Sequence, residues 1–128
     1  MNVPDGLLFT KDHEWVIIEA NRATVGISDY AQSSLGDITF VEMPGIGKNF
    51  KQSEMIATVE SVKAASEVYA PMAGKIVEVN DDIVRTPELI NKSPYEKGWF
   101  CVIELSDKEE KKKLMTPEKY REFIKGLH

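Results

Sequence analysis

One lysine, Lys63, stands in a run of small and polar residues where its amine could serve as a chemical handle. It lies in ESVKAAS, and the flanking stretches MIATV and VYA are apolar and rich in β-branched residues, as is typical of strands. The pattern predicts a β-hairpin within about 55–79 whose tip presents Lys63, whereas Lys75 falls in the alternating strand KIVEV, where an outward charge is ordinary. An amine on a rigid turn can enter another enzyme's active site and be acylated. A solvated turn lysine without a role has the same spacing and is more common, so spacing alone does not decide.

The residues that usually build catalytic or metal sites form no recognisable constellation. His13 and His128 do not make a metal-spaced pair, and the neighbours Asp12, His13 and Glu14 would point alternately to opposite sides of an extended segment. There is no G-x-S-x-G motif and no glycine-rich loop leading into a helix, and the glycines of MPGIGK are typical of turns. We therefore expect no catalytic residue and no metal, which favours a carrier over an enzyme.

Length and composition limit the class of protein further. The chain has 128 residues, a net charge of −5 and a pI near 5.1, with basic residues spread along it, so neither nucleic acid nor an anionic membrane is an expected partner. The single cysteine, Cys101, lies in the apolar strand WFCVIEL and is expected to be a buried, inert thiol. The N-terminal residues lack the features of a signal or transit peptide. We expect one soluble, monomeric domain over 1–128 in the cytoplasm, with a processed mitochondrial matrix protein as the alternative.

The elements that must position Lys63 are mostly short strands. Strands are expected in WVIIEA and RATVGIS, which form a hairpin about Asn21, and in DITFVEM, SEMIATV, SEVYA, KIVEV and WFCVIEL. The fold class predicted is a mainly β barrel or sandwich with short peripheral helices.

Helix signals are fewer. A short helix is expected from the N-cap Ser28 to Leu35, with Gly36 as a left-handed stop, and a helical turn is expected at TPELIN with Thr86 as its cap. Asp81 and Asp82 are assigned to a solvated turn. Ser106 and Glu109 match a capping box, and a C-terminal helix at about 116–126 would bury one face on the β-core. That face comprises Tyr120, Phe123, Ile124 and Leu127.

Several segments, in order over residues 7 to about 127, together resemble the glycine cleavage system H protein family. They are TKDHEWV, VGISDYAQSSLGDITFVEMP, ATVESVKAASEVYAPMAGKIVEVN, PELIN, SPYEKGWF and the final helix. The resemblance implies a barrel-sandwich hybrid of the lipoyl-domain type, with lipoic acid in amide linkage to Lys63. It also implies a non-catalytic shuttle that takes an aminomethyl group from the P protein, a pyridoxal-phosphate glycine decarboxylase, to the T protein, a tetrahydrofolate-dependent aminomethyltransferase. Electrons then pass to the L protein, a dihydrolipoamide dehydrogenase.

The same resemblance assigns roles to other residues. The enzyme that attaches the lipoyl group is expected to read residues around the hairpin, namely Gly47, Glu60, Glu67 and Gly74. The glycines also suit turns, and the glutamates also keep the hairpin soluble. A surface cleft is expected to hold the cationic amine of the cargo through Glu14, which otherwise would be an ordinary outward strand residue. The remaining residues of this cleft are expected to be Asp12, Ala31, Ser34, Leu35 and Glu67.

Three other functions fit parts of the pattern. A biotin carrier uses a similar hairpin, but its lysine usually lies between methionines, whereas Val62 and Ala64 flank Lys63 here. An H-like protein that relays or stores lipoyl groups would have much the same sequence. A cofactor-free interaction module would have little reason to keep Lys63, Glu60 and Gly74 together.

Overall fold

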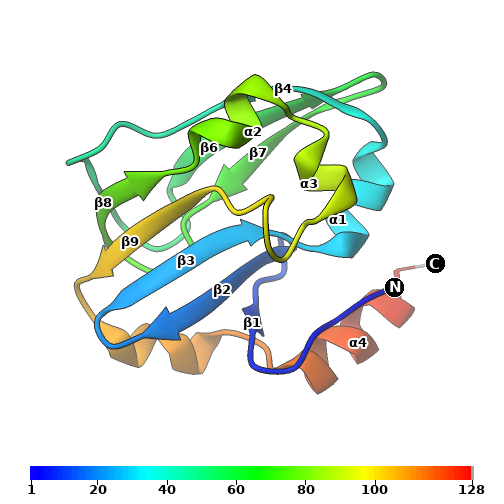
Figure 1. The fold of residues 1–128 in the computed structure, drawn as a ribbon. Helices are drawn as coiled ribbons and strands as arrows, with labels where there is room; N and C mark the ends of the chain where they lie inside the picture. The colour runs from blue at the N-terminus through cyan, green and yellow to red at the C-terminus, as the bar shows by residue number, and fades with distance from the viewer. Residues whose placement is uncertain (128) are drawn as a thin grey trace.

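The computed structural model describes residues 1–127 as two β-sheets with short helices around them (Figure 1). The strands are β1 Leu8–Phe9, β2 Glu14–Glu19, β3 Arg22–Ile27, β4 Ile38–Glu42, β5 Asn49–Phe50, β6 Met55–Ser61, β7 Ala65–Tyr69, β8 Gly74–Val79 and β9 Cys101–Leu105. The helices are α1 Asp29–Leu35, α2 Asp81–Arg85, α3 Leu89–Lys92, a 3₁₀ helix Lys108–Lys113 and α4 Pro117–Lys125. The mainly β fold with short peripheral helices and a C-terminal helix is therefore confirmed.

One sheet has six strands in the order β1-β2-β3-β9-β8-β5, and the other has three in the order β4-β6-β7, all pairs antiparallel. Between the sheets lies a core of aliphatic residues that includes Val25, Val59, Ile76 and Ile103, none of them exposed. Burying these side chains is the main stabilising contribution. The three-stranded sheet carries the β6–β7 hairpin, so the core fixes the base of the predicted handle.

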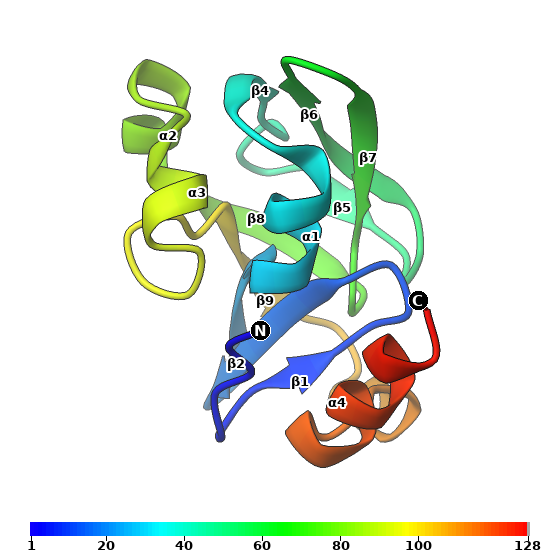
Figure 2. The same ribbon diagram turned by 90° about the vertical axis from the view of Figure 1, so that its right-hand side faces the viewer.

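A second, aromatic cluster joins the C-terminal helix to the six-stranded sheet. Tyr120 stacks on Phe9 of β1, with ring centroids 4.3 Å apart, and Ile124 is also buried. In Figure 2, α4 lies beside β1, and the turn of the β6–β7 hairpin lies at the other end of the molecule. The predicted helical face is right for Tyr120 and Ile124, but wrong for Leu127, which lies beyond the last helical turn and is 45% exposed.

The ends of the helices differ in detail from the sequence prediction. Ser28 caps α1 as predicted, and Gly36 ends the helix as predicted with a positive φ of 76°, but its ψ of −158° differs from that of the αL conformation. Asp81 and Asp82 begin a helix, α2, because the side chain of Asn80 accepts the N–H of Asp82.

Two predicted caps are also wrong. Thr86 ends α2 and does not begin α3, whose N-cap Glu88 makes no side-chain capping bond. The capping box at Ser106 is displaced by one residue, because the side chain of Asp107 accepts the N–H of Glu109. At Ser106 the neighbouring Asp107 competes for the same backbone donor, and local sequence does not rank the two.

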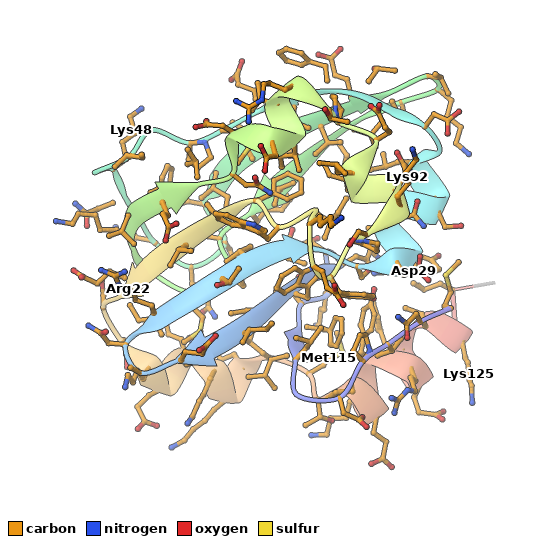
Figure 3. All side chains as sticks on the ribbon, viewed as in Figure 1. Arg22, Asp29, Lys48, Lys92, Met115 and Lys125 are labelled. Carbon is orange, nitrogen blue, oxygen red and sulfur yellow. The ribbon has the colours of Figure 1, made fainter. Side chains whose placement is uncertain are left out.

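Charged side chains extend outward around the fold, as the labelled Arg22, Lys48, Lys92 and Lys125 do in Figure 3. No helix within the described residues combines the length and the apolar character needed to cross a bilayer. Cys101 is fully buried, and burial raises the pKa of its thiol to about 12. The prediction of a buried thiol is thus correct, and its raised pKa keeps it protonated at neutral pH.

Candidate functional site at the β6–β7 hairpin

Lys63 lies at the tip of the β6–β7 hairpin, as predicted, and its side chain is exposed. The turn is closed by the N–H of Ser61, which donates to the carbonyl of Ala64 at 2.7 Å, and by the N–H of Ala64, which donates to Ser61 Oγ at 3.1 Å. The tip is also tied to the connection between α1 and β4, because the N–H of Val62 donates to the carbonyl of Asp37 at 3.0 Å. The amine therefore extends from a backbone held at several points.

The Lys63 side chain lies against the end of α1. A Cβ built on Gly36 would be 3.4 Å from Lys63 Cε and 4.0 Å from Nζ, so the missing side chain of Gly36 leaves space for the lysine. Val62, its neighbour, is 70% exposed, and Ala64 and Ala65 are also exposed. Small neighbours on both sides thus leave the amine open to an approaching enzyme.

The two predicted acidic recognition residues lie on the same sheet as Lys63. Glu60 and Glu67 are both exposed, and the phenol of Tyr69 donates a hydrogen bond of 2.8 Å to Glu67. Glu60 pairs with Ala65 across the hairpin, and Glu67 pairs with Thr58. Directly paired residues on antiparallel strands point to the same face, so Glu60, in the first pair from the turn, and Glu67, in the third, lie on one face of the hairpin.

The two predicted recognition glycines have structural reasons of their own. Gly47 has φ +91°, in the region that disfavours side chains, and nothing lies within 4 Å of a Cβ built on it. A Cβ on Gly74 would be 2.1 Å from the carbonyl oxygen of Glu104 on β9. Lys48, next to Gly47, and the first residues of β8 lie at the end of the molecule opposite the hairpin turn (Figures 1 and 3). Neither glycine lies beside Lys63.

A cleft of about 630 Å³ opens between β7 and the turn that precedes β2. Asp12 and Glu67 supply its two carboxylates, while Lys11 and His13 extend from the turn. The remaining lining residues are Thr58, Ala65, Ser66 and Tyr69. Two of the six predicted cleft residues, Asp12 and Glu67, are thus brought together on either side of an open groove. The volume lies in the range of small-molecule sites.

Glu14 lies deeper than the sequence suggests. It is 1% exposed, Thr10 Oγ1 donates to one carboxyl oxygen, and the N–H of Tyr69 donates to the other at 3.1 Å. It borders a smaller cleft of about 250 Å³ that shares Lys11, Asp12 and Tyr69 with the larger one. The expectation of an outward strand residue is therefore wrong, and Glu14 is a buried carboxyl group in the wall of the smaller cleft. The reason is that His13 has φ 70°, which breaks the alternation of side chains assumed for this segment.

Burial raises the pKa of Glu14 to about 7, despite the opposing hydrogen bonds from Thr10 and Tyr69. The folded state therefore binds this proton more tightly than the unfolded state, and the free energy of unfolding should rise as pH falls from about 7 towards 4.5. The contribution is at most about 3 kcal/mol. We expect Glu14→Gln, which cannot ionise, to flatten this slope when unfolding by urea is measured between pH 5 and 8. An equal slope in Glu14→Gln and parent would contradict the titration.

The other predicted cleft residues come from α1 and lie elsewhere. Ala31 and Leu35 are half-buried and pack against the main core, and Ser34 is exposed. None of the three lines either cleft, because Ala31 and Leu35 face the core, while the end of α1 at Gly36 lies beside the Lys63 side chain. Within residues 1–127 no group of three potential metal ligands occurs, and His128 lies outside the described residues.

Sequence reasoning missed Tyr69 and gave His13 no role beyond a possible metal ligand. Tyr69 bonds to both predicted carboxylates, through its N–H to Glu14 and through its phenol to Glu67. His13 lies in the wall of the larger cleft, 2.8 Å from the hydroxyl of Tyr120. The HEW motif is the only local signal for His13, and no signal in the sequence connects it to a residue 107 positions away.

Comparison with known proteins gives one consistent result. Residues 7–127 match the family model described as glycine cleavage H-protein. A glycine cleavage system H protein of Oceanobacillus iheyensis is 51% identical over 124 residues, which cover 97% of this chain and 98% of that protein. One of Halothermothrix orenii is 47% identical over 127 residues, or 99% of each chain.

A solved structure agrees with these sequences. The crystal structure of a glycine cleavage system H protein from Mycobacterium marinum superimposes with a TM-score of 0.84 at 34% identity. The superposition covers 92% of this chain and 95% of that one. Sequence and fold thus indicate the same family across nearly the whole chain.

Proposed function

Because this chain belongs to the glycine cleavage H-protein family, and is thus a lipoyl carrier of the glycine cleavage system with a barrel-sandwich hybrid fold, we propose that Lys63 is the residue that bears the lipoyl group. The observation that carries this proposal is the position of Lys63 at the tip of a hairpin that is fixed by hydrogen bonds on both sides. A fixed backbone beneath a long flexible side chain lets the amine reach into an enzyme while the domain stays folded.

The attaching enzyme would read the hairpin by its acidic face. Glu60 and Glu67 are exposed on the sheet that carries Lys63, so basic side chains of that enzyme could contact them while the amine enters the active site. Gly47 and Gly74 would act indirectly. Each allows a backbone arrangement that supports the strands below the hairpin, and neither is close enough to the tip to be read together with the amine.

The larger cleft would hold the loaded arm. When bound, the lipoyl group would supply a disulfide whose sulfur atoms accept an aminomethyl group and electrons. Asp12 and Glu67 lie on opposite walls and would attract the cationic amine of the cargo, and Ala65 and the Tyr69 ring would contact the arm. Glu14 would act from behind this wall by fixing the backbone of Tyr69. Ala31, Ser34 and Leu35 would contact the part of the arm nearest Lys63, because α1 ends beside that side chain.

The protein itself would catalyse no step. Its partners would be the P, T and L proteins, each of which acts on the same arm in turn, together with the attaching enzyme. Tethering would raise the effective concentration of the cargo at each active site, and the cleft would limit contact with water in transit. The whole chain 1–128 would form one monomeric carrier domain, and the bacterial relatives favour the cytoplasm as its compartment.

Peptide mass spectrometry on protein from its own cell tests the attachment directly. We expect the peptide containing Lys63 to carry a lipoyl group in amide linkage and the peptide containing Lys75 to be unmodified. Lys75 is exposed but lies within β8, paired with Asn49 and Glu104, so its backbone cannot leave the sheet to enter an active site. An unmodified Lys63, or a biotinyl group on it, would contradict the proposal.

A further inference from the structure

The C-terminal helix reaches the cleft through one buried phenol. The Tyr120 hydroxyl lies 2.8 Å from His13 Nδ1 and 2.7 Å from Ser28 Oγ, and the Tyr120 side chain has no exposed surface. His13 lies in the wall of the larger cleft, and Ser28 is the N-cap of α1. One hydroxyl therefore connects the cleft, the first turn of α1 and α4.

The donors and acceptors of these hydrogen bonds follow from the number of protons that each group carries. Ser28 Oγ accepts the N–H of Ala31 at 3.2 Å, and within residues 1–127 the only acceptor in reach of its own proton is the Tyr120 oxygen. A buried hydroxyl proton without an acceptor is costly, so Ser28 donates to Tyr120. Tyr120 then has its own proton left to donate, and His13 Nδ1 is the remaining partner. Nδ1 must accept, which places the imidazole proton on Nε2.

Protonating His13 would reverse this order. A protonated Nδ1 would have to donate to Tyr120, Tyr120 would turn its proton to Ser28, and the Ser28 proton would be left without an acceptor. Burial also lowers the pKa of His13, against the opposing effect of Asp12. The other ionisable groups around the ring are Lys11, Glu67 and Tyr69 in the cleft, Tyr30 of α1 and Tyr120 of α4.

We propose that Tyr120 and Ser28 hold His13 as a neutral imidazole with its proton on Nε2, so that the cleft keeps its negative charge for a cationic amine cargo. The part of this proposal that concerns the cargo rests on the proposed function. The part that concerns the protonation state of the imidazole does not. A cationic His13 would share the wall with Asp12 and would oppose the attraction between the carboxylates and the amine. Tyr120 is thus a positioning residue, which acts on the cleft through His13.

Nitrogen-15 NMR of the imidazole in the unmodified protein tests this state without the cofactor. We expect Nδ1 to be unprotonated and Nε2 protonated at pH 7, and the pKa of His13 to lie below 6.5. Tyr120→Phe keeps the ring that stacks on Phe9 but removes the hydroxyl. In this variant both neutral tautomers of His13 should be populated, and the pKa of His13 should rise by about half a unit to one unit.

Tyr30→Phe is the matched control. The ring centroid of Tyr30 is 4.7 Å from that of His13, but the hydroxyl that bonds to His13 is that of Tyr120 and not that of Tyr30. We expect the parent tautomer and pKa in this variant. A parent His13 with its proton on Nδ1, or a cationic His13 at pH 7, would overturn the proposal even if Tyr120→Phe failed to fold. An unchanged tautomer and pKa in folded Tyr120→Phe would equally overturn it.

The consequence for the cargo is measured on loaded, lipoylated protein. At pH 6 we expect Tyr120→Phe to lose its cargo in water roughly twofold to fivefold faster than Tyr30→Phe. The effect is modest because the cleft is partly solvated, which weakens the repulsion between a cationic His13 and the amine of the cargo. Intact-mass measurements over time follow the loss. Equal loss would overturn the role of His13 in holding the cargo. Failure of the proposed function would look different, because Lys63 would then carry no lipoyl group while the tautomer of His13 stayed as expected.

Discussion

Lys63→Arg is expected to abolish carrier activity while the protein stays folded. Arginine keeps the length and positive charge of the side chain, but its guanidinium stays protonated at all physiological pH values and cannot form the amide. Loss of the tether removes the gain in effective concentration, so exchange of bicarbonate with the carboxyl group of glycine, measured with P protein, should fall by at least about 100-fold. Free energies of unfolding should agree within about 0.5 kcal/mol, because the side chain is exposed.

Lys75→Arg is the control for this change. It makes the same substitution at another exposed lysine, which lies within β8 and is paired on both sides. We expect full lipoylation and parental exchange from this variant. Lipoylation of Lys63→Arg at another residue would contradict the assignment of Lys63. A parent protein that is lipoylated but supports no exchange with P protein would point instead to the relay or storage of lipoyl groups.

The parts of the fold that could be predicted are those with strong local patterns. Short runs rich in apolar and β-branched residues predict β2, β3, β6 and β8, because each of these strands buries several side chains. The two-residue strand β5 was missed, since it pairs with β8 through tertiary structure and has no periodicity of its own. The cap expected at Ser106 lies one residue further along, at Asp107, because adjacent polar side chains compete for the same N–H group.

In the candidate site, too, some residues could be placed from local sequence and others could not. Lys63 and the acidic residues of the hairpin could be predicted, because turn and strand are continuous in the sequence. Glu14 could not be placed, since the positive φ of His13 redirects the side chains that follow it. The hydrogen bond between His13 and Tyr120 spans 107 residues, so only the packing of α4 on β1 brings the two together. Positions set by backbone dihedrals or by distant packing are those that local pattern does not encode.

Gly74→Ala is expected to destabilise the fold by about 3 kcal/mol or more. The new Cβ would be 2.1 Å from the carbonyl oxygen of Glu104 and 2.5 Å from Ile103 Cγ2. Neither atom can move cheaply, because β9 is paired on both sides, with β3 and β8, and Ile103 is fully buried. Strands β8 and β9 would have to separate at this point, which costs core packing as well as ladder hydrogen bonds. Urea unfolding at neutral pH measures the loss.

Gly47→Ala separates this steric effect from backbone strain. Gly47 has φ +91° and open space around a built Cβ, so alanine there should cost only about 1–2 kcal/mol, from the dihedral alone. Lys48, next to Gly47, and the start of β8, which is Gly74, lie away from the hairpin turn, so the initial rate of lipoylation, corrected for the folded fraction, should match the parent in both variants. A folded Gly74→Ala protein that is not lipoylated would show that the attaching enzyme contacts this end of the molecule directly. If the rates match, both glycines serve recognition only by keeping in place the strands from which Lys63 extends.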